Sequence, residues 1–395
     1  MPAIPQSRTR LAGALLLALA LPLSAQSPEP ESPVEDATVE ATVEDPGLEV
    51  AAESAGPTPQ TDPALLDAEI MPRANRSLLL DVVRTTSGFF AVGERGHVLV
   101  SEDGQSWTQA KVPTRATLTT IATADGVLWA AGHDGVIVHS TDGGQTWTRR
   151  RAAPWSYDIV DSSEGIPVLD LLFTDGSNGL AVGAYSLMLA TSDGGVTWTP
   201  RRVSSAAPAA EAEAESSEEL ADEDDWNFSD ADLELEAESD PHFNAIARAG
   251  SGALVIAGER GAFLRSRDGG KTWTSKPLPY EGSMFGVLSW QDEHILVYGL
   301  RGNVFESFDL GTTWTEVETG ITDNLMGGQA LPGGGALIVG ANGAVLYRPD
   351  GGTPFRSSAF ETAGGETPVL ASAVALNDGS FVLVGDKGVD TYRPE

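Results

Sequence analysis

The chain has 395 residues with 41% hydrophobic content and 44 glycines, which suits a sizeable core built from many short strands and tight turns. Its formal net charge of -33 argues against a nucleic-acid partner, because a phosphate backbone requires clustered Lys and Arg. The sequence contains no cysteine, which excludes disulfides, thiol catalysis, Cys-ligated zinc and a lipidated cysteine.

The first 25 residues have the pattern of an export signal. Arg8 and Arg10 form a basic region, residues 11–21 an apolar region, and a small-residue cleavage site ends at Ala25. The apolar region is shorter than the roughly 20 residues that span a bilayer. We therefore expect cleavage after Ala25, a periplasmic or, as the alternative, extracellular location, and no membrane insertion of the mature chain, which we expect to be a monomer.

Two acidic segments differ in composition from the rest of the chain. Residues 26–63 are rich in Pro, Glu and Ser and predict a disordered linker. Residues 204–240 form a second low-complexity acidic block, which interrupts the ordered pattern of residues 64–395 without ending it. A solubilising loop and an internal competitor for acidic partners are both compatible with this block.

A repeat with a period of about 40 residues determines the expected fold. An apolar run ends in Gly, a second Gly or its substitute starts another run, and that run ends in an Asp-containing turn followed by Trp. The leading glycines of the seven units are Gly93, Gly132, Gly183, Gly258, Gly299, Gly340 and Gly385. The spacing predicts an all-β, seven-bladed β-propeller of four-stranded blades, with a disordered acidic N-terminal segment and an acidic insertion between blades 3 and 4.

The last unit ends after only three strands. We expect the segment from Leu66 to Arg73, just before the first blade, to supply the missing outer strand. Both chain ends would then share one blade, and the closed ring would leave no exposed sheet edge.

The repeated turn has the pattern S-x-D-x-G-x-T-W of the Asp box, as in STDGGQTW from Ser140 to Trp147. Asp and Ser side chains can bond backbone N–H groups of a turn, Gly accepts a positive φ, and Trp packs against the blade. We therefore expect a structural role for five pairs: Asp103 and Trp107, Asp142 and Trp147, Asp193 and Trp198, Asp268 and Trp273, Asp309 and Trp314.

The units GERGHVLVSEDG, GHDGVIVHSTDGGQTW and GLRGNVFESFD, with the segment PYEGSMFGVL, resemble the Asp-box propellers of the photosystem II stability and assembly factor family. The resemblance covers residues from about 65 to 395. It implies a lumenal or periplasmic protein that binds a membrane-protein precursor or complex during assembly, without cofactor and without turnover. The two acidic segments depart from the family, so a cell-envelope complex outside photosynthesis is an equal alternative as the client.

In a four-stranded blade, the turn between strands two and three lies on the same face as the connections between blades. Tips with Arg or Lys make this face the one basic cluster of an acidic protein, suited to grip carboxylates of a partner. Solvated turns without a partner are the alternative interpretation. The candidate partner-binding residues are Arg95, Arg115, His133, Tyr185, Arg260, Arg301 and Lys387. Four aromatic residues of the connections could join them: Trp155, Tyr157, Tyr280 and Phe285.

Two other functions compete with an assembly scaffold. A sialidase-like or other glycan-binding or glycan-hydrolysing propeller needs an Arg triad with a Tyr–Glu pair, or two spaced carboxylates. Arg95, Arg260 and Arg301 imitate a triad, but no Tyr–Glu pair accompanies them, so we expect no enzyme. The five His residues lack ligand spacing, so we expect no metal. A structural spacer of the cell envelope is the remaining alternative.

Overall fold

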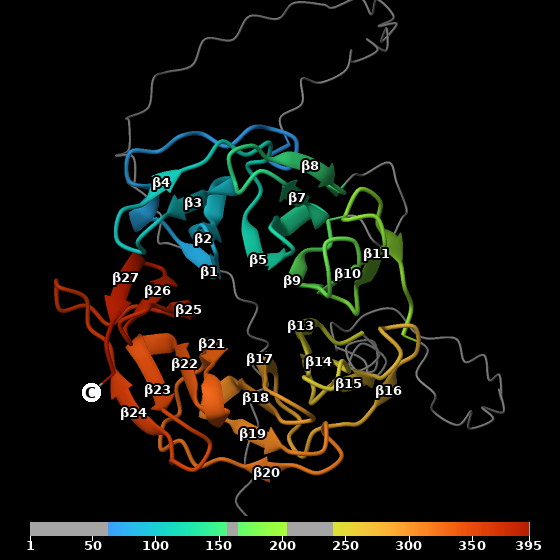
Figure 1. Cartoon of the computed structure of the whole chain (residues 1–395), viewed down its shortest axis with the longest axis vertical. Helices are drawn as coiled ribbons and strands as arrows, with labels where there is room; N and C mark the ends of the chain where they lie inside the picture. The colour runs from blue at the N-terminus through green and yellow to red at the C-terminus, as the bar shows by residue number, and fades with distance from the viewer. Residues whose placement is uncertain (1–61, 156–164, 204–239, 395) are drawn as a thin grey trace, which may run out of the picture. The chain divides into compact units, whose positions relative to one another are not determined.

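The computed structural model describes residues 62–155, 165–203 and 240–394, all of which belong to one compact unit of residues 57–395. These residues form seven antiparallel sheets arranged around a central axis (Figure 1). The predicted seven-bladed, all-β propeller is therefore confirmed. The predicted export signal, nearly all of the linker and the insertion, and also Tyr157, lie outside the described residues.

Each blade is a simple antiparallel sheet whose strands follow in chain order from the axis outward. Blade 1 contains β1 (Leu79–Thr85), β2 (Gly88–Gly93), β3 (Val98–Ser101) and β4 (Thr108–Gln109); blade 2 contains β5 (Leu118–Ala124), β6 (Val127–Gly132), β7 (Ile137–Ser140) and β8 (Thr148–Arg151); blade 3 contains β9 (Val168–Phe173), β10 (Gly179–Gly183), β11 (Met188–Thr191) and β12 (Thr199–Pro200). Blade 4 contains β13 (Phe243–Arg248), β14 (Leu254–Gly258), β15 (Phe263–Ser266) and β16 (Thr274–Ser275).

The remaining three blades complete the ring. Blade 5 contains β17 (Met284–Ser289), β18 (Ile295–Gly299), β19 (Val304–Ser307) and β20 (Thr315–Glu316); blade 6 contains β21 (Leu325–Ala330), β22 (Ala336–Gly340), β23 (Ala344–Arg348) and β24 (Arg356–Ala359); blade 7 contains β25 (Leu370–Ala375), β26 (Phe381–Gly385) and β27 (Gly388–Tyr392). Six single 3-10 turns accompany them: η1 (Ala74–Arg76), η2 (Glu94–Gly96), η3 (His133–Gly135), η4 (Leu300–Gly302), η5 (Pro332–Gly334) and η6 (Ala341–Gly343).

The second strand of each blade is its most apolar element, and every residue of β2, β10, β14, β18, β22 and β26 is buried. A strand covered on both faces needs a continuous apolar run rather than an alternating one. Outer strands such as β16 and β20 are exposed. The apolar runs that end at the leading glycines therefore place the core between blades.

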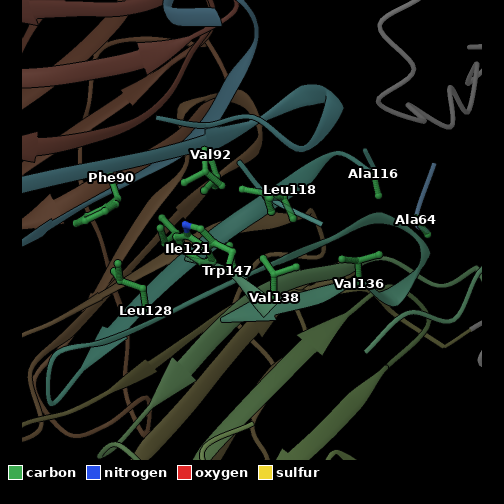
Figure 2. Close-up of a cluster of buried hydrophobic side chains, with 13 residues drawn as sticks. Ala64, Phe90, Val92, Ala116, Leu118, Ile121, Leu128, Val136, Val138 and Trp147 are labelled. Atoms are coloured by element: carbon green, nitrogen blue, oxygen red, sulfur yellow. The ribbon is translucent and has the colours of Figure 1, made fainter. Parts of the chain in front are cut away.

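Seven clusters of buried side chains join the blades, one between each neighbouring pair. Figure 2 shows the cluster between blades 1 and 2, where Phe90 and Val92 face Leu118, Ile121 and other residues of blade 2. Because each blade buries apolar side chains on both faces, no blade completes a core without its two neighbours.

The turn after the third strand has the same hydrogen bonds in several blades. In blade 2, Ser140 Oγ donates to Asp142 Oδ1 (2.8 Å) and accepts from Gly144 N–H (2.9 Å). Thr146 donates its hydroxyl and its backbone N–H to Asp142, which lowers the pKa of that carboxyl to about 2. Trp147 Nε1 donates to the Gly144 carbonyl (3.2 Å). Equivalent carboxylates accept hydrogen bonds at Asp103, Asp193, Asp268 and Asp309.

The expected closure of the ring by Leu66–Arg73 is wrong, because blade 7 has three strands in the described part of the chain. Residues 68–71 lie along blade 1 instead, and only η1, which follows them, reaches β27 of blade 7. Ala68 N–H donates to the Val112 carbonyl (2.9 Å), and Met71 N–H donates to Gln109 Oε1 (2.7 Å). The side chain of Gln109 also donates to the Glu69 carbonyl (2.9 Å), so this one amide holds the segment to the outer edge of blade 1.

Blades 7 and 1 are joined by packing and by side-chain hydrogen bonds. Val382 and Val384 of blade 7 share a buried cluster with Leu79 and Leu99 of blade 1. The guanidinium of Arg84 donates to the Ala375 carbonyl (3.1 Å) and to an Asn377 side chain. Closure therefore follows the same burial rule as the other six interfaces.

Blade 6 replaces the Ser of the repeated turn with Arg348, which is only 4% exposed. Its guanidinium donates two hydrogen bonds to Glu306 of blade 5, one of them at 3.1 Å, and lies 4.7 Å from the Phe355 ring centre. His294 Nε2 contacts the same carboxylate at 2.7 Å. Burial alone would raise the pKa of Glu306, but the hydrogen bonds and charges of these partners lower it to about 2.

Polar side chains connect the inner strands of blades 7, 1, 2, 3 and 4. Each inner strand has a bulge after its first residue, which re-aims the third residue toward the neighbouring blades. Asp81 accepts from Ser372 Oγ of blade 7 (2.9 Å) and from Ile121 N–H of blade 2 (2.9 Å). Asp170 accepts from Thr120 Oγ1 of blade 2 (3.1 Å) and from Ile246 N–H of blade 4 (2.8 Å).

The surrounding protein removes most of the water around the carboxyl groups of Asp81 and Asp170, although both residues are only partly buried. Burial raises the pKa of Asp81. Burial and, less strongly, the charge of Asp81 raise the pKa of Asp170 to about 7, against the hydrogen bond from Ile246. At a pH where two exposed carboxyl groups would both be ionised, this pair therefore retains a proton.

Glu306→Gln should lower the free energy of unfolding by about 3 kcal/mol, because it leaves the buried guanidinium of Arg348 without its counter-charge. Glu293→Gln is the matched control, since Glu293 pairs with a half-exposed Arg267 and surface pairs contribute little. Urea unfolding of both variants measures the difference. Equal stability of the two variants would contradict the assignment of Glu306 to the inter-blade core.

Asp170→Asn should change how stability depends on pH. Between pH 3.8 and about 7, the folded protein retains a proton on Asp170 that the unfolded chain releases, so wild-type stability falls as pH rises through this window. Asn does not titrate. The free energy of unfolding of the variant should therefore rise relative to that of the wild type over the same pH window, by at most about 4 kcal/mol. Thermal unfolding at several pH values measures this, and a parallel pH profile would contradict the raised pKa.

Candidate functional site

The turns between the second and third strands, here called the tips, share one end of the blades. In each blade the first tip residue donates its backbone N–H to the segment that enters the inner strand, as Glu94 does to the Leu78 carbonyl at 3.0 Å. The six equivalent bonds are His133 to Thr117, Ala184 to Pro167, Glu259 to His242, Leu300 to Ser283, Ala341 to Asn324 and Asp386 to Val369. The tips and the connections between blades therefore form one face, the tip face.

The repeated turns lie at the opposite end of the blades. A groove of about 650 Å³ also lies there, between blades 7 and 1, and is lined by residues that include Arg84, Asn377 and Arg393. Most of its charged groups already have partners, such as Arg393 with Asp378 at 2.6 Å. This groove lies away from every candidate binding residue that the sequence predicts.

Three tips present Arg in a left-handed backbone conformation. The φ angles are 55° at Arg95, 53° at Arg260 and 58° at Arg301, and all three residues are exposed. Asn342 occupies the same position in blade 6 with φ 54°. Asn tolerates this conformation better than residues with long side chains, so Arg at these positions has a conformational cost that the turn itself does not require.

Acidic residues at the first tip position fold back onto the scaffold. Glu94 accepts from Leu78 N–H (3.4 Å), Glu259 from His242 N–H (3.2 Å), and Asp386 from Val369 N–H (2.9 Å). Their carboxylates hold the incoming chain, and the residue that follows each of them is basic: Arg95, Arg260 and Lys387. Each such tip therefore has a structural carboxylate next to a basic residue.

Two of the predicted basic residues are already paired. Arg115 forms an ion pair with Glu69 at 2.8 Å and donates to the Asp67 carbonyl (3.0 Å). Lys387 lies 3.5 Å from Glu366. The sequence analysis assigned both to the basic cluster of this face, and it missed their partners because Glu69 and Glu366 lie outside the repeated units. The cationic part of the tip face therefore centres on the tips of blades 1, 4 and 5.

The side chains of Arg95 and Arg301 make no hydrogen bond or ion pair within the described ranges. The backbone N–H of Arg301 donates to Asn324 Oδ1 (2.9 Å), which fixes the turn without engaging the guanidinium. Two exposed guanidinium groups are thus held in place by their turns and remain available to carboxylates.

The other predicted residues differ in accessibility. His133 is exposed, and Tyr185 is 58% exposed with its ring centre 4.8 Å from that of His242. Trp155 is 57% exposed, whereas Tyr280 packs against the core between blades 4 and 5. The tip face therefore carries aromatic surface as well as cations.

Phe285 is half-buried on the inner strand β17, so it belongs to the axis and not to a connection. Sequence reasoning also missed two polar residues of the inner strands, Asp81 and Asp170. The only signal was an Asp inside two apolar runs, LLDVV and VLDLL, which are otherwise typical of buried strands.

The described residues contain neither a candidate metal centre nor a membrane-spanning helix. There, no group of three or more His, Asp or Glu side chains is arranged to hold a metal ion. Among the same residues, none forms a helix with the length and apolarity that crossing a membrane requires.

Arg95→Asn and Arg301→Asn should each raise the free energy of unfolding by about 0.5 kcal/mol, because Asn adopts the left-handed turn at lower cost. Asn342→Arg, the reverse change in blade 6, should lower it by a similar amount. Chemical unfolding measures all three. Loss of stability in both Arg variants would show that these side chains stabilise the fold and are not held out for a partner.

Sequence comparison places this propeller among known families. Residues 71–283 match the DUF6242 beta propeller domain, and residues 218–394 match the photosynthesis system II assembly factor YCF48. No protein of curated function matches the chain.

Three solved structures illustrate the likeness of the fold. YCF48 bound to a D1 peptide has 14% identity and a TM-score of 0.55, with coverage of 86% of this chain and 97% of that chain. YCF48 from Cyanidioschyzon merolae has 16% identity, a TM-score of 0.56, and coverage of 84% and 99%. Streptogramin B lyase has 12% identity, a TM-score of 0.60, and coverage of 82% and 96%.

At these identities the structural likeness shows the fold alone, whereas the sequence matches show the family. The predicted resemblance to photosystem II assembly-factor propellers is confirmed by the match of residues 218–394. The match of residues 71–283 covers more than half of the sequence, and the chain therefore belongs to the DUF6242 beta-propeller family.

Proposed function

We propose that this protein is a non-catalytic binding scaffold whose tip face takes a carboxylate-bearing segment of a membrane protein subunit during assembly of a membrane complex. The observation that carries the proposal is the set of three exposed, left-handed Arg residues: Arg95, Arg260 and Arg301. A peptide carboxylate is the partner that a guanidinium fork recognises best, through two parallel charge-assisted hydrogen bonds.

The chemistry of the face supports binding without turnover. Acidic groups next to the Arg tips, such as Glu94 and Glu259, accept backbone hydrogen bonds from the scaffold and are not poised as an acid–base pair. Tyr185, the exposed tyrosine of the tips, contacts His242 rather than a carboxylate. These contacts favour a docking surface over a sialidase-like arrangement.

The comparisons support the class of partner. One protein of similar fold, YCF48, has been solved bound to a D1 peptide. By analogy, the partner of this chain would be a polypeptide segment rather than a small metabolite. The export pattern of residues 1–25 extends the proposal to a location outside the cytoplasm, where the chain would meet the exposed part of a membrane complex.

Affinity capture from detergent-solubilised membranes tests the proposal. We expect the wild-type chain to retain a membrane protein complex and the triple variant R95N/R260N/R301N to lose at least about tenfold in affinity, since each charge-assisted hydrogen bond contributes roughly 1.5–3 kcal/mol. Added salt should weaken wild-type capture, because exposed charge pairs are screened. A D1 peptide serves as a defined probe in parallel.

The control variant R267N/R356N/R393N removes the same charge from the opposite end of the blades. Its three residues are exposed and lie beside the repeated turns or on the outer strand β24. Equal capture by the wild type and both triple variants would refute the tip face as the binding site. Loss of capture in both triple variants would show that binding depends on net charge, and would also refute the tip face as the binding site.

A further inference from the structure

The outer edge of blade 7 is an unpaired strand edge. Within the described residues, β27 pairs with β26 on one side and with no strand on the other (Figure 1). The third strand of each of the other six blades has an outer partner. An unpaired edge presents backbone N–H and C=O groups to which a further extended chain can bond.

The backbone carbonyl of Val389 lacks a hydrogen bond that its counterparts receive. In four other blades, the carbonyl at this position accepts the N–H of the residue that follows the outer strand, at 2.8 or 2.9 Å; these carbonyls belong to Val98, Met188, Phe263 and Val304. All five residues pair with the residue before the leading glycine of their blade. In the described part of the chain, no backbone N–H from beyond blade 7 reaches the Val389 carbonyl.

The backbone N–H of Thr391, two residues further along the same edge, is bonded only to its own neighbour. It donates to Asp390 Oδ1 at 3.2 Å. The equivalent residue of blade 1, Val100, pairs instead with Thr108 of the outer strand β4. Residues two apart in a strand face the same side of the ladder, and Thr391 is exposed. The Val389 carbonyl and the Thr391 N–H can therefore form a short ladder with an added strand.

The turn η1 covers only the start of this edge. A Cβ atom on Gly388 would lie 2.1 Å from the carbonyl oxygen of Asn75, so the backbone of η1 lies against Gly388. Among the described residues, no backbone hydrogen bond joins η1 to β27. The edge is therefore blocked at Gly388 and accessible from Val389 to Thr391.

Two basic residues at η1 lie at the end of the edge that is closer to the tip face. Arg76 belongs to η1 and Arg73 precedes it, and both are exposed. Neither side chain makes a hydrogen bond or ion pair with the residues that the structure describes. Lys387, at the neighbouring tip, is already paired with Glu366 at 3.5 Å. Acidic groups at the end of an added strand would complement the charges of Arg73 and Arg76.

At its other end, the edge leads into the groove between blades 7 and 1. Thr391, Tyr392 and Arg393 contribute to the lining of this space of about 650 Å³. Blade 1 contributes hydroxyl and amide groups to the same lining, including Ser87 and Gln105. The groove therefore has room and hydrogen-bonding groups for the residues that precede an added strand.

We propose that the outer edge of β27 is a docking site for an extended segment of a partner protein, which adds a fourth strand to blade 7 and ends in acidic side chains beside Arg73 and Arg76. In the other six blades the outer strand is antiparallel to the third strand. Because β27 begins just after a tip, an antiparallel strand runs from the groove toward the tip face. This site goes beyond the function proposed above, since it binds the backbone of the partner at the side of the ring.

The charges favour an acidic partner over a second copy of this chain. Antiparallel pairing of two β27 edges would bring Arg393 of one copy toward Arg73 and Arg76 of the other. Like charges next to each other oppose association. A segment that alternates β-branched residues and ends in Glu or Asp avoids this repulsion and suits an edge position.

The test uses the full chain and synthetic peptides whose binding is followed by fluorescence anisotropy. The probe is the acetylated, amidated and labelled peptide Thr-Val-Thr-Val-Thr-Glu-Glu. A version methylated at every backbone nitrogen cannot donate to the Val389 carbonyl and should bind at least about tenfold more weakly. A version that ends in Lys-Lys should bind about fivefold more weakly. No binding of the probe, or equal binding of the methylated peptide, would overturn the site.

Two substitutions at the edge should act in opposite directions. Thr391→Pro removes the N–H and should weaken the probe by about tenfold, while an edge strand tolerates Pro. Asp390→Ala should strengthen binding by about threefold, because it releases the Thr391 N–H and removes a negative charge from the edge. Thermal unfolding checks that both variants fold. Unchanged affinity in folded Thr391→Pro, or weaker binding in folded Asp390→Ala, would overturn the site.

Two further variants separate the charges at η1 from those of the tip face. R73Q/R76Q should reduce the affinity for the acidic probe to about that for the Lys-Lys peptide. R95N/R260N/R301N leaves the edge of β27 unchanged, so it should bind the probe as the wild type does even where it loses capture of a membrane complex. Loss of probe binding in R95N/R260N/R301N alone would assign the peptide to the tips and overturn the edge site.

Hydrogen exchange of the chain without peptide shows whether the edge is already covered. We expect the Thr391 amide to exchange rapidly in the chain alone and slowly when the probe is bound. Slow exchange without the probe at every protein concentration would show that the chain covers its own edge. Slow exchange only at high concentration would show that a second copy covers it. Either result would overturn the proposal.

Discussion

Burial of both faces of every blade is the constraint on which the rest of this structure depends. The second strands are almost entirely apolar, and each interface between blades is a cluster such as the one formed by Phe90 and Leu118. Each blade therefore completes its core only against its neighbours in the ring. The same constraint applies where the ring closes, since Val382 of blade 7, which has three strands within the described residues, packs against Leu79 of blade 1.

The two ends of the blades differ in how their polar groups are bonded. At one end, the turns around residues such as Asp142 and Trp147 satisfy their polar groups internally and leave little for a ligand. At the other end, Glu94 holds the incoming chain while Arg95 extends into solvent in a left-handed conformation. Strain without local compensation is typical of functional positions. The same ring of blades occurs in the DUF6242 and YCF48 propellers whose sequence models match this chain.

Sequence alone predicted the blade number and the strand order, because glycine pairs such as Gly132 and Gly135 mark the turns. A Cβ atom at Gly132 would lie 2.0 Å from the Thr117 carbonyl oxygen, and Gly135 has a φ of 57°. It failed where the partner is a single side chain far along the chain. Gln109 decides where residues 66–73 lie, and Glu69 neutralises Arg115, yet neither has a pattern that sequence spacing reveals. The sequence also did not predict the hydrogen-bonded link from Asp81 to Asp170 through Thr120, since a bulge and not a motif brings these residues together.

Hydrogen exchange of the chain in complex with its captured membrane subunit shows which face the partner covers. We expect the partner to protect backbone amides of the tips in blades 1, 4 and 5, around Arg95, Arg260 and Arg301, and to leave the repeated turns at the opposite end unchanged. Protection confined to the turns around Asp142 and Asp268, or to the groove between blades 7 and 1, would contradict this expectation.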